Sequence, residues 1–171
     1  MEPSIIQPGD VLLFQGKTFL SRGIMWFTSS KYSHSAVAVS GTYAIEATRA
    51  GVEKNPIDVL LTHADAYCIR RMPDLTVEQS ELIKDKAYSL IYDDYDVIQL
   101  LTLGIYYAFR KIGITWAGLV LNMPHQMTCS ELVAVCFLCV PLKFRNKAKL
   151  VTPGDLYSTD ELATILEAKV E

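Results

Sequence analysis

The feature of this sequence that most constrains its fold is a change of hydrophobic period near residue 75. Before this point, short apolar runs bounded by turn residues predict a turn and strand over 7–14, strands at 34–40, 42–48 and 66–72, and a weaker strand within 51–61. After it, apolar residues recur at helical spacing in LTVEQSELIKDKAYSLIY, which begins with the capping box Thr76–Gln79. Strands in the first half and helices in the second predict an α+β domain.

Further segments are also expected to be helical. VIQLLTLGIYYAFRKIGITWAGLVL (97–121) is long enough to cross a bilayer, but Arg110 and Lys111 lie at its middle, where a charge is costly. We therefore expect one or two buried helices joined at a bend, with a membrane span or a lipid-facing or substrate-covering role as the alternatives. A helix is expected from TCSE (128–131) to Pro141. VTPGDLY is expected to form a turn and a short extended stretch, and a last helix should run from STDE (158–161) to the C-terminus.

The 171 residues are enough for one domain with a substantial core, so we expect a single domain over 1–171. A net charge of −3 lacks the basic excess typical of phosphate-binding surfaces, which argues against a nucleic-acid partner. The N-terminal stretch has no secretory pattern, and the four cysteines are expected to be free thiols in a reducing compartment such as the cytoplasm. A signal removed before residue 1 stays open, and the oligomeric state is not predicted.

Cysteine spacing gives little support for a metal site. Cys136 and Cys139 form a C-x-x-C inside an apolar helical run without a second ligand pair. We interpret both as buried thiols, and no metal or organic cofactor is expected.

Cys129 is placed differently from the other cysteines. Thr128 is a natural N-cap and Glu131 completes the box, so Cys129 should occupy the first helical position. The unpaired N–H groups and the helix dipole favour an anion there, and this lowers the pKa of a thiol. The alternatives are a nucleophile and one more buried cysteine at a helix start.

A hairpin over 32–52 places a histidine and a glutamate on one face. If the chain reverses near Ser40–Gly41, His34 and Glu46 are opposite or diagonal, with Cβ atoms about 5 to 7 Å apart. The rest of that face is small (Ala36, Ala38 and Ala44), which would leave room for an incoming helix. The alternative is a strand-end histidine near water and a glutamate at a sheet edge.

Five motifs in order now resemble a known family. PGDVLLF, YSHSAVAV, AIEA, TCSELV and TPGDLY are similar to the permuted papain-like branch of the NlpC-type cysteine peptidases, in particular the YiiX-like group. The resemblance spans Pro8 to about Tyr157. It implies a circularly permuted papain-like fold, in which a small antiparallel β-barrel packs on the helix that carries the nucleophile.

The resemblance also implies site residues. Cys129 would be the nucleophile, His34 the general base and Glu46 the group that orients it. Tyr32 would be an oxyanion donor together with the Cys129 backbone N–H. Two further residues, Tyr95 and Asp96, would line the substrate cleft or anchor the nucleophile helix.

The expected activity is hydrolysis of an amide bond through a thioester, with small peptides, including peptidoglycan-derived ones, as the substrate class. Relatives that cut cell-wall peptides often carry secretion signals or wall-binding domains, and neither is present in this sequence. Lipid-directed members commonly have Asn or Arg before the cysteine and a histidine soon after it. MTCSELV has neither, which favours a peptidase or amidase. A lipid- or thioester-directed acyl hydrolase or acyltransferase, and a non-catalytic binding domain, are the alternatives.

Overall fold

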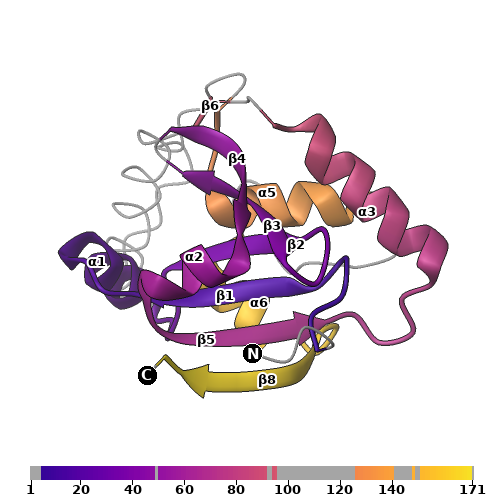
Figure 1. The fold of residues 1–171 in the computed structure, drawn as a ribbon. Helices are drawn as coiled ribbons and strands as arrows, with labels where there is room; N and C mark the ends of the chain where they lie inside the picture. Colours follow the sequence, from indigo (N-terminus) through magenta and orange to yellow (C-terminus); the bar gives the residue numbers. More distant parts are fainter. Residues whose placement is uncertain are drawn as a thin grey trace.

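The computed structural model describes residues 5–48, 50–91, 94–95, 126–140, 148 and 151–170. Its centre is a six-stranded sheet of order β4-β3-β2-β1-β5-β8, in which every neighbouring pair is antiparallel (Figure 1). The strands are β1 (Val11–Gly16), β2 (His34–Ala38), β3 (Tyr43–Thr48), β4 (Gly51–Pro56), β5 (Ala64–Arg71) and β8 (Ala163–Lys169).

The helices that surround this sheet are mostly short. They are α1 (Phe19–Thr28), α2 (Ile57–Thr62), α3 (Val77–Ser89), α5 (Cys129–Cys136), the 3-10 turn η1 (Phe137–Cys139) and α6 (Pro153–Ser158). A separate parallel pair joins β6 (Asp94–Tyr95) to β7 (Gln126–Met127). The predicted α+β class is confirmed. Because β4 and β8 are the two edges of the sheet in the described part of the chain, the predicted closed barrel is not confirmed.

Alternating residues of the strands pack into two separate cores, one on each face of the sheet. Val37 of β2 and Ile45 of β3 join the core that contains Leu132 and Phe137, beneath α3 and α5. Ala36, Ala38 and Ala44 belong to the opposite core, which α2 covers. The small alanines do leave room for a helix, but that helix is α2, whereas the helix that begins with Cys129 lies on the other face.

The C-terminal region differs from the sequence prediction. Thr152 caps α6 through a capping box with Asp155, and Pro153 occupies the first turn, so the expected extended stretch is a helix. The expected last helix is wrong, because Ala163–Lys169 forms strand β8 along the edge of β5. Its alanine, glutamate and lysine residues favour a helix locally, but a free sheet edge offers backbone hydrogen bonds that local propensity does not register.

Two other predictions concern the second half of the chain. The segment 97–121 lies outside the described residues, and no helix in the described ranges is long and apolar enough to cross a membrane. The thiols of Cys136 and Cys139 are free, but the prediction that both are buried holds for Cys136 and is wrong for Cys139, which is exposed at the 3-10 turn η1.

Candidate active site

The β2–β3 hairpin brings His34 and Glu46 together as the sequence predicts. Ala36 is the direct partner of Glu46 in the register, so His34 is its diagonal neighbour on the same face. The distance between His34 Nε2 and Glu46 Oε2 is 2.5 Å. His34 is the first residue of β2 and 28% of its side chain is exposed, but its ring is bound to Glu46, which is buried and does not lie at a sheet edge.

Glu46 is held from a third strand. Asn55 of β4 pairs with Ala44 in the register, which makes it a diagonal neighbour of Glu46, and its Nδ2 donates to Glu46 Oε1 at 2.9 Å. Burial would raise the pKa of Glu46, but the hydrogen bonds and charge of His34 and the amide of Asn55 hold it below its usual value. Asn55 was not predicted from the sequence. The sequence feature that could have identified it is a polar residue in the weak strand after Glu46, at a position that shares a face with Glu46.

Cys129 is the first residue of α5, as predicted, and its side chain is buried. The Thr128 hydroxyl accepts from the Glu131 N–H at 3.2 Å and fixes the first turn of the helix. Helix α5 packs along β2 and β3, and its first residue, Cys129, interacts with His34 and Ser35 at the start of β2. Cys129 raises the pKa of His34 through its charge and a hydrogen bond. The backbone N–H of Ser35 lowers the pKa of the Cys129 thiol.

The electrostatics of this pair favour charge separation. Burial alone would raise the pKa of the Cys129 thiol, but the charge of His34 and a hydrogen bond with its ring lower it to about 7. Burial would likewise lower the pKa of His34, but Cys129 and Glu46 raise it to about 10. Because Nε2 is bound to Glu46, Nδ1 is the ring nitrogen left for Cys129. Near neutral pH the arrangement supports a thiolate beside an imidazolium.

The other predicted site residues have different positions. Tyr32 is buried, and its hydroxyl donates to Glu167 Oε1 of β8 at 2.8 Å, so its role as an oxyanion donor stays a prediction. Tyr95 lies in β6, but its side chain, like the whole of Asp96, lies outside the described residues.

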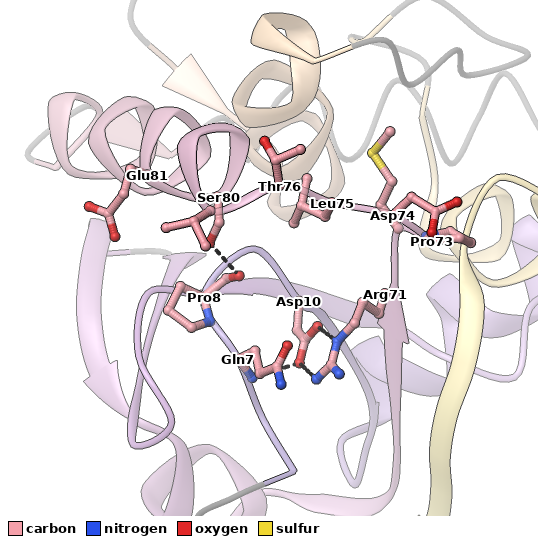
Figure 2. A pocket seen from close by; sticks show the side chains of 12 residues that line it. Gln7, Pro8, Asp10, Arg71, Pro73, Asp74, Leu75, Thr76, Ser80 and Glu81 are labelled. Atoms are coloured by element: carbon pink, nitrogen blue, oxygen red, sulfur yellow. Dashed lines mark hydrogen bonds and ion pairs between the residues drawn. The ribbon is translucent and has the colours of Figure 1, made fainter.

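A second polar cluster lies at the opposite end of β1 from His34. Phe14 is the register partner of His34, whereas Asp10 precedes the first residue of the strand. Asp10 is buried and binds Arg71 through both of its oxygens, at 2.6 and 2.8 Å (Figure 2). This ion pair borders a hollow of about 380 Å³ beside the start of α3. The two clusters are therefore separated by the length of the strand.

Within the described ranges, no three His, Cys, Asp or Glu side chains are grouped so that they could hold a metal ion. The chemistry that the described residues offer at this site is that of a nucleophilic thiol, an imidazole and a carboxylate.

Comparison with known proteins gives three findings. A family model described as "Permuted papain-like amidase enzyme, YaeF/YiiX, C92 family" matches residues 5–166. The "Probable lipoprotein peptidase YaeF" of Escherichia coli K12 is 33% identical over 91 residues, which are 49% of this chain and 33% of that protein, so the match spans about a third of the relative. The crystal structure of "metalloprotein yiiX from Escherichia coli O157:H7, DUF1105" has a TM-score of 0.73 at 18% identity, over 95% of this chain and 98% of the other.

Proposed function

The chain belongs to the permuted papain-like amidase family of YaeF and YiiX, and on this premise we propose that it is a cysteine hydrolase that cleaves an amide bond. In this proposal Cys129 is the nucleophile, His34 the general base and acid, and Glu46 the residue that orients the imidazole. The observation that carries it is the convergence of α5, β2 and β3 on one imidazole, which is bound by Glu46 at 2.5 Å and faces the buried thiol.

The proposed reaction begins with the Cys129 thiolate attacking the carbonyl carbon of the amide. The oxyanion is held by the Cys129 backbone N–H at the start of α5 and by a second donor, for which Tyr32 is the candidate. His34 then gives its proton to the leaving nitrogen, the C–N bond breaks, and a thioester remains on Sγ. A water molecule, deprotonated by His34, attacks the thioester and releases the carboxylic acid and the thiol.

Glu46 keeps the imidazole in the orientation that both steps require. Its carboxylate binds Nε2, which leaves Nδ1 for the proton that moves between Cys129 and the leaving group. Asn55 in turn holds the other carboxylate oxygen. The base is therefore fixed by two neighbouring strands rather than by a loop.

The substrate class proposed is a small peptide or amide. Peptidoglycan-derived peptides are one candidate, and the name of the YaeF relative refers to a lipoprotein peptidase. The yiiX protein is described as a metalloprotein, but the described residues of this chain include no group of three side chains that could hold a metal ion, and we derive no step through a metal.

The test is a measurement of turnover and thiol reactivity in Cys129→Ala and in the wild type. We expect Cys129→Ala to lose turnover of peptide amides completely while unfolding at the same denaturant concentration. Iodoacetamide should alkylate Cys129 with a midpoint near pH 7, ahead of the other three thiols, because burial raises the pKa of Cys68 and Cys136 and the partial desolvation of the thiol raises that of Cys139. In His34→Ala the largest of the effects that oppose burial is removed and only the hydrogen bonds of Ser35 and Ser130 still lower the pKa of the thiol, so this midpoint should rise well above pH 7.

The matched control is Cys139→Ala, which removes an exposed thiol and should keep full activity. Full activity in Cys129→Ala would overturn the assignment. Release of fatty acid from phospholipid without release of amine from peptides would select the acyl-hydrolase alternative. Ligand binding with no turnover in the wild type would select a binding domain.

A further inference from the structure

The segment of residues 29–33 joins α1 to β2 and ends directly before the candidate base. It packs closely on α6, since a Cβ added to Gly154 would lie 3.1 Å from the Cβ of Ser30. Further along the segment, the ring of Tyr32 lies beside that of Tyr157 in α6, with 5.1 Å between the ring centroids. An element from the C-terminal part of the chain therefore supports the approach to the candidate site.

A carboxylate of β8, the strand that pairs with β5 at one edge of the sheet, binds the same segment (Figure 1). The buried Tyr32 donates its hydroxyl proton to Glu167 Oε1 at 2.8 Å, and Lys31 Nζ lies 3.5 Å from the same oxygen. The Tyr157 hydroxyl donates to Glu167 Oε2 at 3.3 Å. The hydrogen bond of Tyr32 and the charge of Lys31 hold the pKa of Glu167 below its usual value, so the group is a carboxylate at neutral pH.

The hydrogen bond to Glu167 restricts what the Tyr32 hydroxyl can do. A phenol has one proton to donate, and burial raises the pKa of Tyr32, so this proton stays on the hydroxyl at neutral pH. Because the proton is donated to Glu167, it is not available to an oxyanion in this conformation. A hydrogen bond from a buried hydroxyl to a charged acceptor is also among the stronger kinds, which suits an anchor.

Only Ser33 separates Tyr32 from His34, and its backbone and side chain are both bound to β1. The Ser33 N–H donates to the Phe14 carbonyl oxygen at 3.0 Å, and Ser33 Oγ accepts from the Gly16 N–H at 3.0 Å. Phe14 is also the register partner of His34. The start of β2 is therefore held by β1 on one side and by the anchored Tyr32 on the other.

We propose that Glu167 and Tyr32 are positioning residues, whose hydrogen bond fixes the start of β2 and thereby the imidazole of His34. This inference rests on the proposed hydrolase function, because it concerns the same imidazole. The ring has to reach Glu46 and the Cys129 thiol at once, although α5 packs on the face of the sheet opposite to Glu46. A reacting group displaced by about 1 Å can lose about a hundredfold in rate, so a small movement of the ring matters.

The experiment compares Tyr32→Phe, Glu167→Ala and the double variant with the wild type by the pH dependence of Cys129 alkylation, which needs no substrate. We expect each single variant to be alkylated about threefold more slowly at pH 7. The double variant should be no slower than either, because both substitutions break one hydrogen bond. Glu167→Gln keeps an oxygen that accepts from Tyr32 and should restore most of the rate. For a peptide amide, kcat should fall about tenfold in each single variant with KM unchanged, because proton transfer at the imidazole is disturbed.

The matched control is Thr164→Val, a change in the same strand. It removes the 2.6 Å hydrogen bond between Arg70 Nη1 and the Thr164 hydroxyl, which does not involve residues 29–33. This variant should unfold at a lower urea concentration than the wild type, as Glu167→Ala should, but keep the wild-type alkylation rate and kcat. The control thus separates weaker pairing of β8 from loss of the anchor.

Three outcomes would overturn the positioning role and leave the proposed function in place. The first is wild-type alkylation and turnover in Glu167→Ala. The second is a loss of kcat in Tyr32→Phe with wild-type alkylation and no such loss in Glu167→Ala, which would assign the hydroxyl to the oxyanion. The third is equal slowing in Thr164→Val, which would assign β8 a purely structural role. An unreactive Cys129 in the wild type would instead overturn the proposed function, and this inference with it.

Discussion

A histidine that takes a proton from a thiol must keep one ring nitrogen free for it, and at His34 this is arranged by Glu46. The carboxylate binds Nε2 at 2.5 Å and raises the pKa of the imidazole together with Cys129, to about 10 against the opposing effect of burial. The thiolate and the imidazolium thus stabilise each other, and Glu46 adds a charge that favours the imidazolium. The charge and the orientation that Glu46 supplies are separate effects, and one substitution separates them.

Glu46→Gln keeps an oxygen that accepts from Nε2 but removes the negative charge. We expect kcat/KM for a peptide amide to fall by roughly tenfold, because the orientation is retained and part of the electrostatic support is lost. Since the carboxylate raises the pKa of His34, its removal should lower that pKa and move the alkaline limb of the pH profile to lower pH. The measurement is kcat/KM from pH 5 to 11.

The control for this substitution is Glu78→Gln in the first turn of α3, far from the hairpin in sequence and on a different element. It should leave both the rate and the alkaline limb unchanged. A Glu46→Gln variant with the wild-type pH profile would contradict the role of Glu46.

At the scale of the element, the start of helix α5 determines the position of the Cys129 side chain. Cys129 is the first residue of α5, and the orientation of its thiol depends on a first turn that the Thr128 hydroxyl fixes through the Glu131 N–H. Thr76 has the same function at the start of α3, where it accepts from the Gln79 N–H at 3.2 Å. The two caps are chemically alike, but only one of them precedes a candidate nucleophile.

Thr128→Ala and Thr76→Ala should therefore have similar effects on stability and different effects on the thiol. Each should lower the free energy of unfolding by about 1 kcal/mol, because each removes one N-cap hydrogen bond. Only Thr128→Ala should slow the alkylation of Cys129 near pH 7. Urea denaturation and alkylation rates measure the two effects, and equal slowing in both variants would show that the thiol responds to global stability alone.

The elements that could be predicted are those whose signals are local. The Thr76 capping box, the hairpin of β2 and β3, and Cys129 at a helix start all depend on residues within a few positions of each other. The helix predicted over 158–171 failed because β8 is stabilised by pairing with β5, a strand almost a hundred residues earlier in the chain. The face to which α5 packs could not be predicted either, because both faces of β2 and β3 are apolar.

At the scale of the whole molecule, contacts between residues distant in sequence anchor the segment next to the candidate site. Tyr32, in the segment that precedes His34, donates to Glu167 of the C-terminal strand, and Tyr157 donates to the same carboxylate at 3.3 Å. The sequence predicted the three candidate catalytic residues but not this anchor, nor the amide of Asn55 behind Glu46. Glu167 has no motif, since only the pairing of β8 with the distant strand β5 brings it into place, whereas Asn55 lies nine residues after Glu46 in the next strand and was missed because that strand is weak in sequence. The single domain over 1–171 stays a prediction.

The Asp10–Arg71 ion pair tests whether a change that lowers the stability of the fold at one end of β1 also affects the candidate site at the other end. Asp10 is fully buried, and it also accepts from the Gln7 N–H at 2.8 Å. Asp10→Asn leaves the Arg71 guanidinium without its counter-charge, which should cost about 2 kcal/mol of unfolding free energy, below the range for fully buried pairs because Arg71 is partly exposed. Alkylation of Cys129 near pH 7 should be unchanged, because His34 lies at the other end of β1 from Asp10.

The control is Asp74→Asn, which changes the same charge beside the same hollow (Figure 2). Asp74 has a φ of 58°, a left-handed conformation that asparagine also tolerates, so the backbone should not be strained. We expect urea denaturation to shift for Asp10→Asn and to stay in place for Asp74→Asn. Slower alkylation of Cys129 in Asp10→Asn at denaturant concentrations where the protein is fully folded would mean that the two ends of the sheet are coupled. The ion pair would then support the candidate site as well as the fold.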